Sequence, residues 1–365
     1  MGRRRSFRKT SKPKLLLIWR RSSGLIKGLE IVWDSATPPH PSLSPEGGGE
    51  DTGEGALICP VYFETSLNRG LMDIVIYGTV NSVIFALIAV GFTLVYGVSR
   101  VPNFAHGSIY VLVGFLTWSF VNDLKLNYAF SVLLSIIIAS LLGLLIYRAV
   151  LIRLRGLPTS EIIASFAVSL IILEGLRMQG IAGFKGFIGP FYVLRPFVEG
   201  KVTLFGVFID YQRLLIVGAG LGVVVLLWVF THYTKMGLSL RAIAQDERAA
   251  MMLGVNSDRT AMISLSIGSA LAGLAAVIIL PLGNVTAEAG YKVLIYALAV
   301  CIIGGLGSWA GAVLASFVIG FAMKISTALF GALWESVVLV GTIILILLFR
   351  PSGLLGKQKE LEERV

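Results

Sequence analysis

Hydrophobic positions in this chain come in long uninterrupted runs, unlike the alternating patterns of soluble helices and strands. From about residue 72 onward, many runs approach or exceed the roughly 18 apolar residues that cross a bilayer as an α-helix. We predict spans at about 78–97, 108–121, 128–147, 162–178, 214–231, 262–282, 293–307, 309–328 and 335–349. The pattern therefore predicts an all-α polytopic membrane protein with about eight or nine transmembrane helices, the short ones being broken or partial.

Composition supports the same class. Hydrophobic residues make up 56% of the chain and charged residues 14%, whereas a soluble domain carries roughly 25% charged residues. The net charge of +10 would suggest nucleic acid in a soluble protein, but in a membrane protein the position of each Lys and Arg matters more. We therefore expect the lipid bilayer, and no nucleic acid, as a partner.

The first 71 residues differ from the rest. A basic cluster at Arg3–Lys9 is followed by a stretch rich in Pro, Gly and Ser at 35–49, which cannot build a packed core. We expect residues 1–71 to be a disordered extension, or a mis-assigned start with Met72 as the true initiator. A basic arm that binds anionic lipid is the alternative. Residues 72–357 then form the transmembrane domain and 358–365 a cytoplasmic tail.

Basic residues between the spans predict the orientation of the chain. Three segments are basic, namely the loop 148–161, the loop 232–261 and the tail after Phe349. They fall on one side when the spans 162–178 and 214–231 form an outward hairpin. By the positive-inside rule that side is the cytoplasm, and residues 179–213 form the largest outward loop.

Motifs for bound cofactors and for catalysis are absent from the sequence. There is no Gly-x-x-x-x-Gly-Lys-Ser/Thr loop, so the chain does not bind ATP by that route. Four charges fall within or beside predicted spans, at Glu174, Arg177, Lys324 and Glu335, and an intramembrane charge is a functional candidate by default. Glu174 and Arg177 are spaced to form a structural pair. Without a chain of carboxylates, an external energy source is favoured over ion coupling.

The loop 232–261 predicts a short amphipathic helix from Leu240 to Leu253, because it holds strong helix formers and no breaker. Leu240, Ile243, Ala250 and Met251 fall on one face. Gly254 is expected to end the helix, and Asn256 to begin the next span. Such a helix either rests on the lipid surface or inserts apolar anchors into a partner's groove.

The sequence from Arg248 to Gly254 has the Ala-Ala-x-x-x-Gly spacing of the loop by which permeases of ATP-binding-cassette importers contact their ATPases. The usual leading Glu is replaced by Arg248, with Glu247 one position earlier. Further sequence motifs match those of one permease family, in the family's order. They lie at Gly237–Asp246, Ala86–Val98 with Asn103–Gly107, Gly304–Ala312 and Phe349–Gly356. From about Met72 to Lys357 the chain thus resembles the branched-chain amino acid permeases of the LivH type.

This resemblance implies a permease subunit of an inner-membrane importer for leucine, isoleucine and valine, and not an enzyme. The implied partners are a second homologous permease, two cytoplasmic ATPases and a periplasmic or lipid-anchored binding protein. ATP is used by the ATPases, so this chain itself binds no cofactor and no metal. The resemblance assigns contact with the ATPases to Arg241, Asp246, Glu247, Arg248, Ala250 and Gly254.

The candidates for the translocation pathway are Asn103, His106, Gly304, Gly305 and Gly307. Asn103 and His106 follow Pro102, which indicates either a broken helix beside the pathway or a plain cytoplasmic turn. We expect His106 to be a hydrogen-bonding group at a helix interface, and the glycines to allow close packing. Three alternatives stay open: a permease of this class for urea or short amides, an ion-coupled secondary carrier, and a solely structural membrane subunit.

Overall fold

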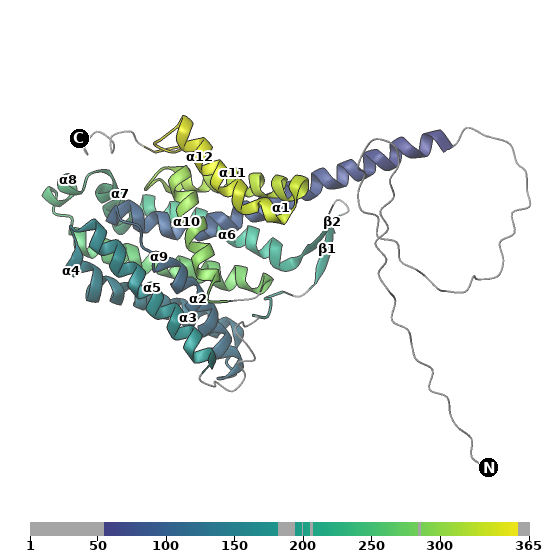
Figure 1. The fold of residues 1–365 in the computed structure, drawn as a ribbon. Coiled ribbons are helices and arrows are strands. Elements are labelled where there is room, and N and C mark those ends of the chain that lie inside the picture. Colours follow the sequence, from purple (N-terminus) through teal and green to yellow (C-terminus); the bar gives the residue numbers. More distant parts are fainter. Residues whose placement is uncertain (1–54, 182–193, 199, 205–206, 284–285, 357–365) are drawn as a thin grey trace, which may run out of the picture. The chain divides into compact units, whose positions relative to one another are not determined.

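The computed structural model describes residues 55–181, 194–198, 200–204, 207–283 and 286–356 (Figure 1). The long helices are α1 (Gly55–Ser99), α2 (His106–Asn122), α3 (Tyr128–Ile146), α5 (Pro158–Ile181), α6 (Tyr211–Tyr233), α9 (Ser257–Ile279), α10 (Ala289–Gly304), α11 (Trp309–Phe330) and α12 (Glu335–Phe349). The short ones are η1 (Tyr147–Leu151), α4 (Ile152–Leu154), α7 (Lys235–Gln245), α8 (Glu247–Met252), η2 (Leu280–Leu282) and η3 (Ala332–Trp334). Residues Cys59–Val365 form one compact unit, which contains these elements apart from the first four residues of α1.

Each predicted span corresponds to one helix, so the all-α polytopic class is confirmed. Seven helices in the described ranges are long and apolar enough to cross a membrane. The other two predicted spans are α2 and α10, with 17 and 16 residues. Between α5 and α6, the expected outward loop contains an antiparallel ribbon of β1 (Lys201–Leu204) and β2 (Val207–Asp210), in which Lys201 pairs with Asp210.

The predicted boundary at Met72 falls inside α1, which begins at Gly55 and whose membrane-spanning part is Gly70–Ser99. The boundary itself stays a prediction. Residues 1–54 and the predicted tail 358–365 lie outside the residues that the structure describes.

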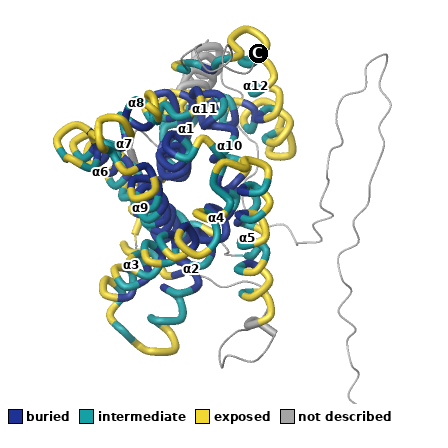
Figure 2. The backbone as a smooth tube through the Cα atoms, turned by 90° about the vertical axis from the view of Figure 1, so that its left-hand side faces the viewer, coloured by how far each residue is buried: buried dark blue, intermediate teal, exposed yellow. Residues whose placement is uncertain are grey.

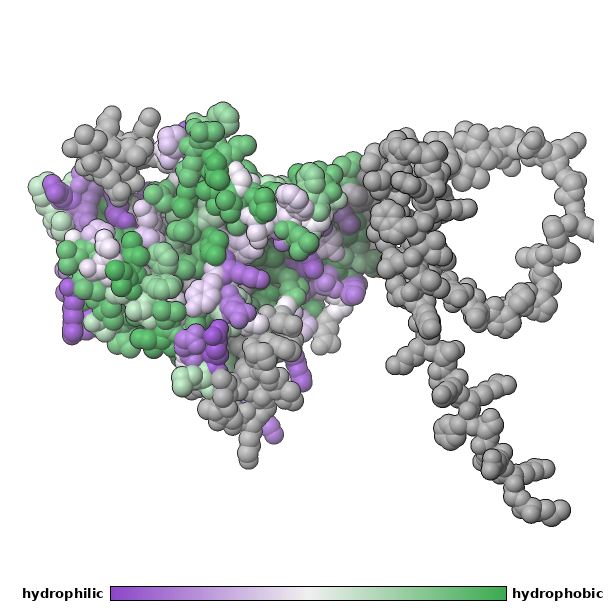
Figure 3. Space-filling model, viewed as in Figure 1, coloured by the Kyte–Doolittle hydropathy of each residue, from purple (hydrophilic) through white to green (hydrophobic). Residues whose placement is uncertain are grey.

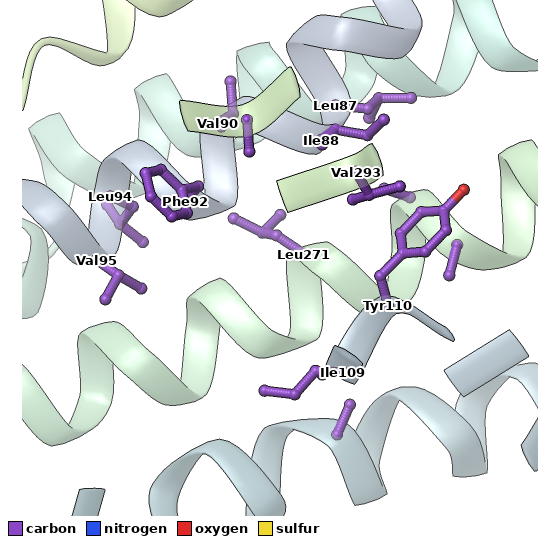
Figure 4. Packing of buried hydrophobic residues seen from close by; sticks show 14 of the residues in the cluster. Leu87, Ile88, Val90, Phe92, Leu94, Val95, Ile109, Tyr110, Leu271 and Val293 are labelled. Carbon is purple, nitrogen blue, oxygen red and sulfur yellow. The ribbon is translucent and has the colours of Figure 1, made fainter. Parts of the chain in front are cut away.

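Helix α1 is the centre of the packing. Its most apolar window is 78% buried, whereas that of α12 is 11% buried, and Figure 2 shows the contrast between the two. Phe92 of α1 packs in one cluster with Ile109 of α2, Leu271 of α9 and Val293 of α10 (Figure 4). The exposed faces of the outer helices are apolar (Figure 3), as expected for surfaces that contact lipid tails.

Helices α2 and α10 are brought together by small residues. A Cβ atom on Gly107 would lie 2.1 Å from the carbonyl oxygen of Gly290, so the two backbones touch. Lipid tails are as apolar as Leu side chains, and close backbone approach is a main source of helix association in a membrane. This contact explains how two short helices are held within a bundle of longer ones.

The three basic segments meet at one end of the helices, which we call the basic end. It carries α4, α7, α8 and residues 350–356. Arg155 of the first loop forms ion pairs with Glu247 and Asp258 of the second. The third segment donates a hydrogen bond of 2.7 Å from the Leu354 amide to the carbonyl oxygen of Ile303, next to the Gly304–Gly307 turn. The predicted shared side is therefore confirmed, and hydrophilic residues gather there around α4 and α8 (Figure 3).

Candidate functional site

The single helix expected at 240–253 is in fact two helices, α7 and α8, which meet at Asp246. The backbone of Asp246 is extended, and its carboxylate accepts a hydrogen bond of 3.0 Å from the Ala249 amide. Asp246 is thus the N-cap of α8. The prediction was wrong at this position because propensity sums favour a continuous helix, whereas a single Asp can bind the backbone and start a new one.

The apolar stripe of this loop packs inward. Leu240, Ile243 and Ala250 are buried within this chain, in contacts with α6 and α9. The fourth predicted member of that face, Met251, is half-exposed. This stripe therefore fixes α7 and α8 to the membrane helices and leaves a different set of side chains for any partner.

That different set consists of Leu238, Met252 and Leu253, which we call the docking surface. Leu238 is 60% exposed, Met252 84% and Leu253 85%. Exposed apolar side chains of this size are typical of a contact with a partner protein or with the lipid surface. Among the predicted coupling residues, Arg248 and Asp246 are also exposed, whereas Arg241 and Glu247 are partly buried.

Gly254 follows the end of α8 and stops this helix, as predicted. Its φ of +87° lies in the left-handed region, which glycine adopts without steric cost. No atom lies within 4 Å of the position that a Cβ would take. Asn256 then caps α9 by accepting a hydrogen bond of 2.9 Å from the Arg259 amide, so the predicted end and start are both confirmed.

Arg155 is a residue of this candidate site that the sequence did not single out. It lies in the turn between α4 and α5, and it contacts Glu247 of α8 together with Ser257 and Asp258 of α9. The Ser257 hydroxyl also donates to Glu247 at 2.5 Å. Sequence reasoning placed Arg155 in a basic loop, but no local spacing connects it with residues so far along the chain.

Tyr147 completes this group, which we call the Arg155 network. It lies in the π-helical turn η1, and its hydroxyl donates to Asp258 at 3.3 Å and lies 3.4 Å from Arg155 Nη1. Partial burial alone would lower the pKa of Arg155, but Tyr147, Asp258 and Glu247 together raise it. The guanidinium therefore stays charged and holds two carboxylates at once.

An open hollow of about 620 Å³ adjoins the Arg155 network. It is lined by Arg155, Glu247, Met251, Gly254, Val255, Asn256, Ser257 and Asp258. The hollow combines charged groups with the exposed edge of α8, beside the docking surface. It offers room for a side chain from outside at the place where α8 joins α9.

The turn between α1 and α2 also lies at the basic end. Arg100 Nη2 donates to the carbonyl oxygen of Ala244 in α7 at 3.1 Å. Asn103 is buried and its Oδ1 accepts from the Ala105 amide at 3.1 Å. His106 Nε2 lies 3.1 Å from the carbonyl oxygen of Ile88, so this nitrogen carries the proton and donates. This geometry agrees with His106 as a hydrogen-bonding group between α1 and α2.

The glycine motif and the C-terminal motif pack on each other. Gly305 has a φ of +99°, and a Cβ atom there would lie 2.3 Å from the Gly356 amide nitrogen. The Leu355 amide donates to the carbonyl oxygen of Gly304 at 3.0 Å. Gly307 in turn lies against Gly97 of α1. The geometry supports backbone packing by these glycines, and their place beside a pathway stays a prediction.

Comparison with known proteins agrees with the motifs. Residues 74–348 match the model of the family described as "Branched-chain amino acid transport system / permease component". The chain is 32% identical to the high-affinity branched-chain amino acid transport system permease protein BraD of Pseudomonas aeruginosa, over 75% of this chain and 92% of that one. It is 28% identical to the corresponding permease protein LivH of Escherichia coli, over 75% and 91%.

A more distant relative is the probable branched-chain amino acid transport permease protein LivH of Methanocaldococcus jannaschii, with 25% identity over 76% of this chain and 90% of that one. These relatives are covered nearly from end to end, and the family match runs from within α1 to the last turn of α12. The chain therefore belongs to the family of branched-chain amino acid transport permeases.

Proposed function

We propose that this chain is the membrane-spanning permease subunit of an ATP-binding-cassette importer for leucine, isoleucine and valine in a bacterial inner membrane. Membership of the permease family carries the proposal. In the proposed complex, two cytoplasmic ATPases hydrolyse ATP, a second homologous permease completes the pathway, and a periplasmic or lipid-anchored binding protein delivers the amino acid. The basic end then faces the cytoplasm.

The docking surface supports the proposed contact with an ATPase. Leu238, Met252 and Leu253 project from α7 and α8, and an apolar anchor on a short helix suits a groove in a partner. The same loop is fixed to the membrane helices by its buried stripe. A partner that binds the docking surface and moves therefore displaces the membrane helices as well, because α7 and α8 are packed against them.

Two polar connections extend this coupling into the bundle. Glu247 of α8 is joined through Arg155 to Asp258 at the start of α9 and to the turn before α5. The carbonyl oxygen of Ala244 in α7 is joined through Arg100 to the end of α1. When the ATPases close on ATP, we expect movement of α7 and α8 to shift α9, α5 and α1 together, and so to switch the pathway between its two sides.

The experiment is reconstitution of the chain with its second permease and ATPases in proteoliposomes, with the binding protein on the outside. We expect leucine uptake that requires ATP and survives an ionophore. Uptake that stops with the ionophore would instead indicate an ion-coupled carrier. Binding proteins loaded with urea or acetamide, assayed in parallel, separate the cargo alternatives. Failure to copurify with any ATPase would overturn the proposal.

A further inference from the structure

Two positive side chains from different helices approach one aromatic ring. The Arg213 guanidinium carbon of α6 lies 4.7 Å from the centroid of the Tyr77 ring of α1. The Lys324 ammonium of α11 lies 4.9 Å from the same centroid. Lys324 is one of the intramembrane charges that the sequence singled out, and nothing at the basic end uses it.

This group lies at the opposite end of the helices from the docking surface. From Tyr77 to Ser99, an α-helix rises about 33 Å, and Ser99 adjoins the Arg100 contact with α7. The Tyr77 hydroxyl donates to the carbonyl oxygen of Phe208 at 2.7 Å, in the β1–β2 ribbon at the other end (Figure 1). Lys324 lies within the spanning helix α11, less than two turns before its end at Phe330. If the basic end is cytoplasmic, the group faces outward.

The charges of this group do not balance. Arg213 Nε lies 3.5 Å from Asp210 Oδ2, and within the described ranges Lys324 has no ion pair. The two cations lie within about 10 Å of each other and repel, more strongly in partly desolvated surroundings than in water. The face of the Tyr77 ring offsets part of that cost. An added anion would offset more of it.

The group is also accessible. The Arg213 side chain is 29% exposed and that of Asp210 42%, and Tyr77 and Lys324 are partly buried. A zwitterion would therefore meet a cation, Arg213 or Lys324, for its carboxylate and, beside Arg213, a carboxylate for its ammonium group. Arginine is suited to the first role because its planar fork matches two carboxylate oxygens.

We propose that Arg213, Lys324 and Tyr77 form a weak binding site for the carboxylate of the transported amino acid at the outer mouth of the pathway. The proposal rests on the proposed function, because it takes the amino acid as the source of the anion. The site holds the substrate after the binding protein releases it. Weak binding suits this role, since a substrate that must move on cannot be held tightly.

The test uses the purified permease–ATPase complex in detergent without the binding protein. Its thermal stability is measured with millimolar L-leucine and with L-leucinamide, which keeps the side chain and lacks the carboxylate. We expect leucine to raise the melting temperature and leucinamide to leave it unchanged. Arg213→Gln and Lys324→Gln each weaken the leucine effect about tenfold in concentration.

Arg177→Gln is the matched control. Arg177 is also a cation near a helix end, 3.4 Å from Glu174 and 3.8 Å from Glu288, and its removal is expected to leave the leucine effect intact. An equal shift with leucinamide, no shift with leucine, or unchanged shifts in both glutamine variants would overturn the proposal. A shift that phosphatidylglycerol alone produces, and that both variants abolish, would assign the site to a lipid headgroup and also overturn it.

Stimulation of ATP hydrolysis by the loaded binding protein is measured on the same wild-type complex. If that stimulation is present while leucine has no direct effect, the carboxylate site fails and the proposed function stands. If stimulation is absent for every loaded binding protein, the proposed function itself fails.

Discussion

The charged side chains at one end of the helix bundle have several partners each, whereas those at the other end have few. At the basic end, Arg155 is held by two carboxylates, a serine and a tyrosine, so each group has several partners. At the other end, Arg213 and Lys324 share one aromatic ring, and in the described ranges only Arg213 has a carboxylate partner. A saturated network keeps a fixed geometry and can transmit a displacement, whereas an undersaturated one is suited to a ligand that comes and goes.

The largest effect is expected when the charge of Arg155, at the centre of the saturated network, is reversed. Arg155→Glu would place a third carboxylate beside Glu247 and Asp258, with a cost of roughly 1–3 kcal/mol at this partly exposed position. We expect the stimulation of ATP hydrolysis by the leucine-loaded binding protein to fall at least tenfold. It is measured in the reconstituted complex. Arg153→Glu in the same loop, where the side chain is exposed, serves as the control.

A double reversal sharpens this test. Adding Glu247→Arg to Arg155→Glu restores opposite charges in the pair, and we expect it to recover part of the stimulation. If Arg155→Glu has full activity, the network is only structural, and the idea that the basic end transmits a displacement is contradicted.

The second prediction concerns the docking surface. Met252→Asp and Leu253→Asp each remove a large exposed apolar group, and we expect each to weaken ATPase binding by about 2 kcal/mol, the usual value for a contact hot spot. Copurification of the ATPases measures this loss. Leu157→Asp is the matched control, since Leu157 is 60% exposed at the same end but outside α7 and α8. Equal losses in all three variants would mean that the docking surface has no special role.

The third prediction concerns Gly254, which follows α8. Gly254→Leu forces a side chain into a left-handed backbone conformation, at a cost of about 1–2 kcal/mol, in a place where nothing obstructs the added atoms. We expect normal amounts of folded protein and reduced uptake, as also for Glu247→Lys. Uptake per inserted permease is the measurement, and normal uptake in both variants contradicts the assignment of this loop to coupling.

The smallest effect on transport is expected where two family motifs touch. Gly305→Ala would bring a Cβ against the Gly356 backbone and should loosen residues 350–356, with a cost on the order of 1–3 kcal/mol. Protease accessibility of the C-terminal segment and the melting temperature measure it. Gly341→Ala is the control, because a Cβ there has no neighbour within 4 Å and alanine favours a helix. Similar melting temperatures for the two variants would rule out the contact as a stabilising one.

The sequence predicted the membrane helices well because hydrophobic length is a local property. It also placed the end of α8 at Gly254 and the cap of α9 at Asn256, which depend on a few neighbouring residues. It did not find the break at Asp246, where one side-chain hydrogen bond outweighs helix propensity. It also left the apolar stripe of α7 and α8 to the lipid surface or to a partner, whereas the chain itself buries most of it, because periodicity identifies an apolar face but not what covers that face.

The sequence did not predict which distant residues come together. Arg155 meets Glu247 and Asp258 only because α4, α8 and α9 converge, and Tyr77 meets Arg213 and Lys324 only because α1 lies between α6 and α11. For Lys324 there was a partial signal, since a charge inside a hydrophobic run is conspicuous. For Arg155 there was none, since it is one arginine among several in a basic loop.

The π-helical turn η1 lies just before Arg155, in the continuous run from α3 to α4. A π turn holds one residue more than a regular α-helical turn, so η1 absorbs the extra residue while the turns on either side keep nearly the register of one α-helix. Deleting a residue of η1, such as Val150, would therefore leave Arg155 near its present orientation. Deleting a residue from the regular helix α3 would instead turn everything after it by about 100°, and Arg155 would point away from Glu247. The same loss of one residue thus has different consequences in two adjoining segments of one helix.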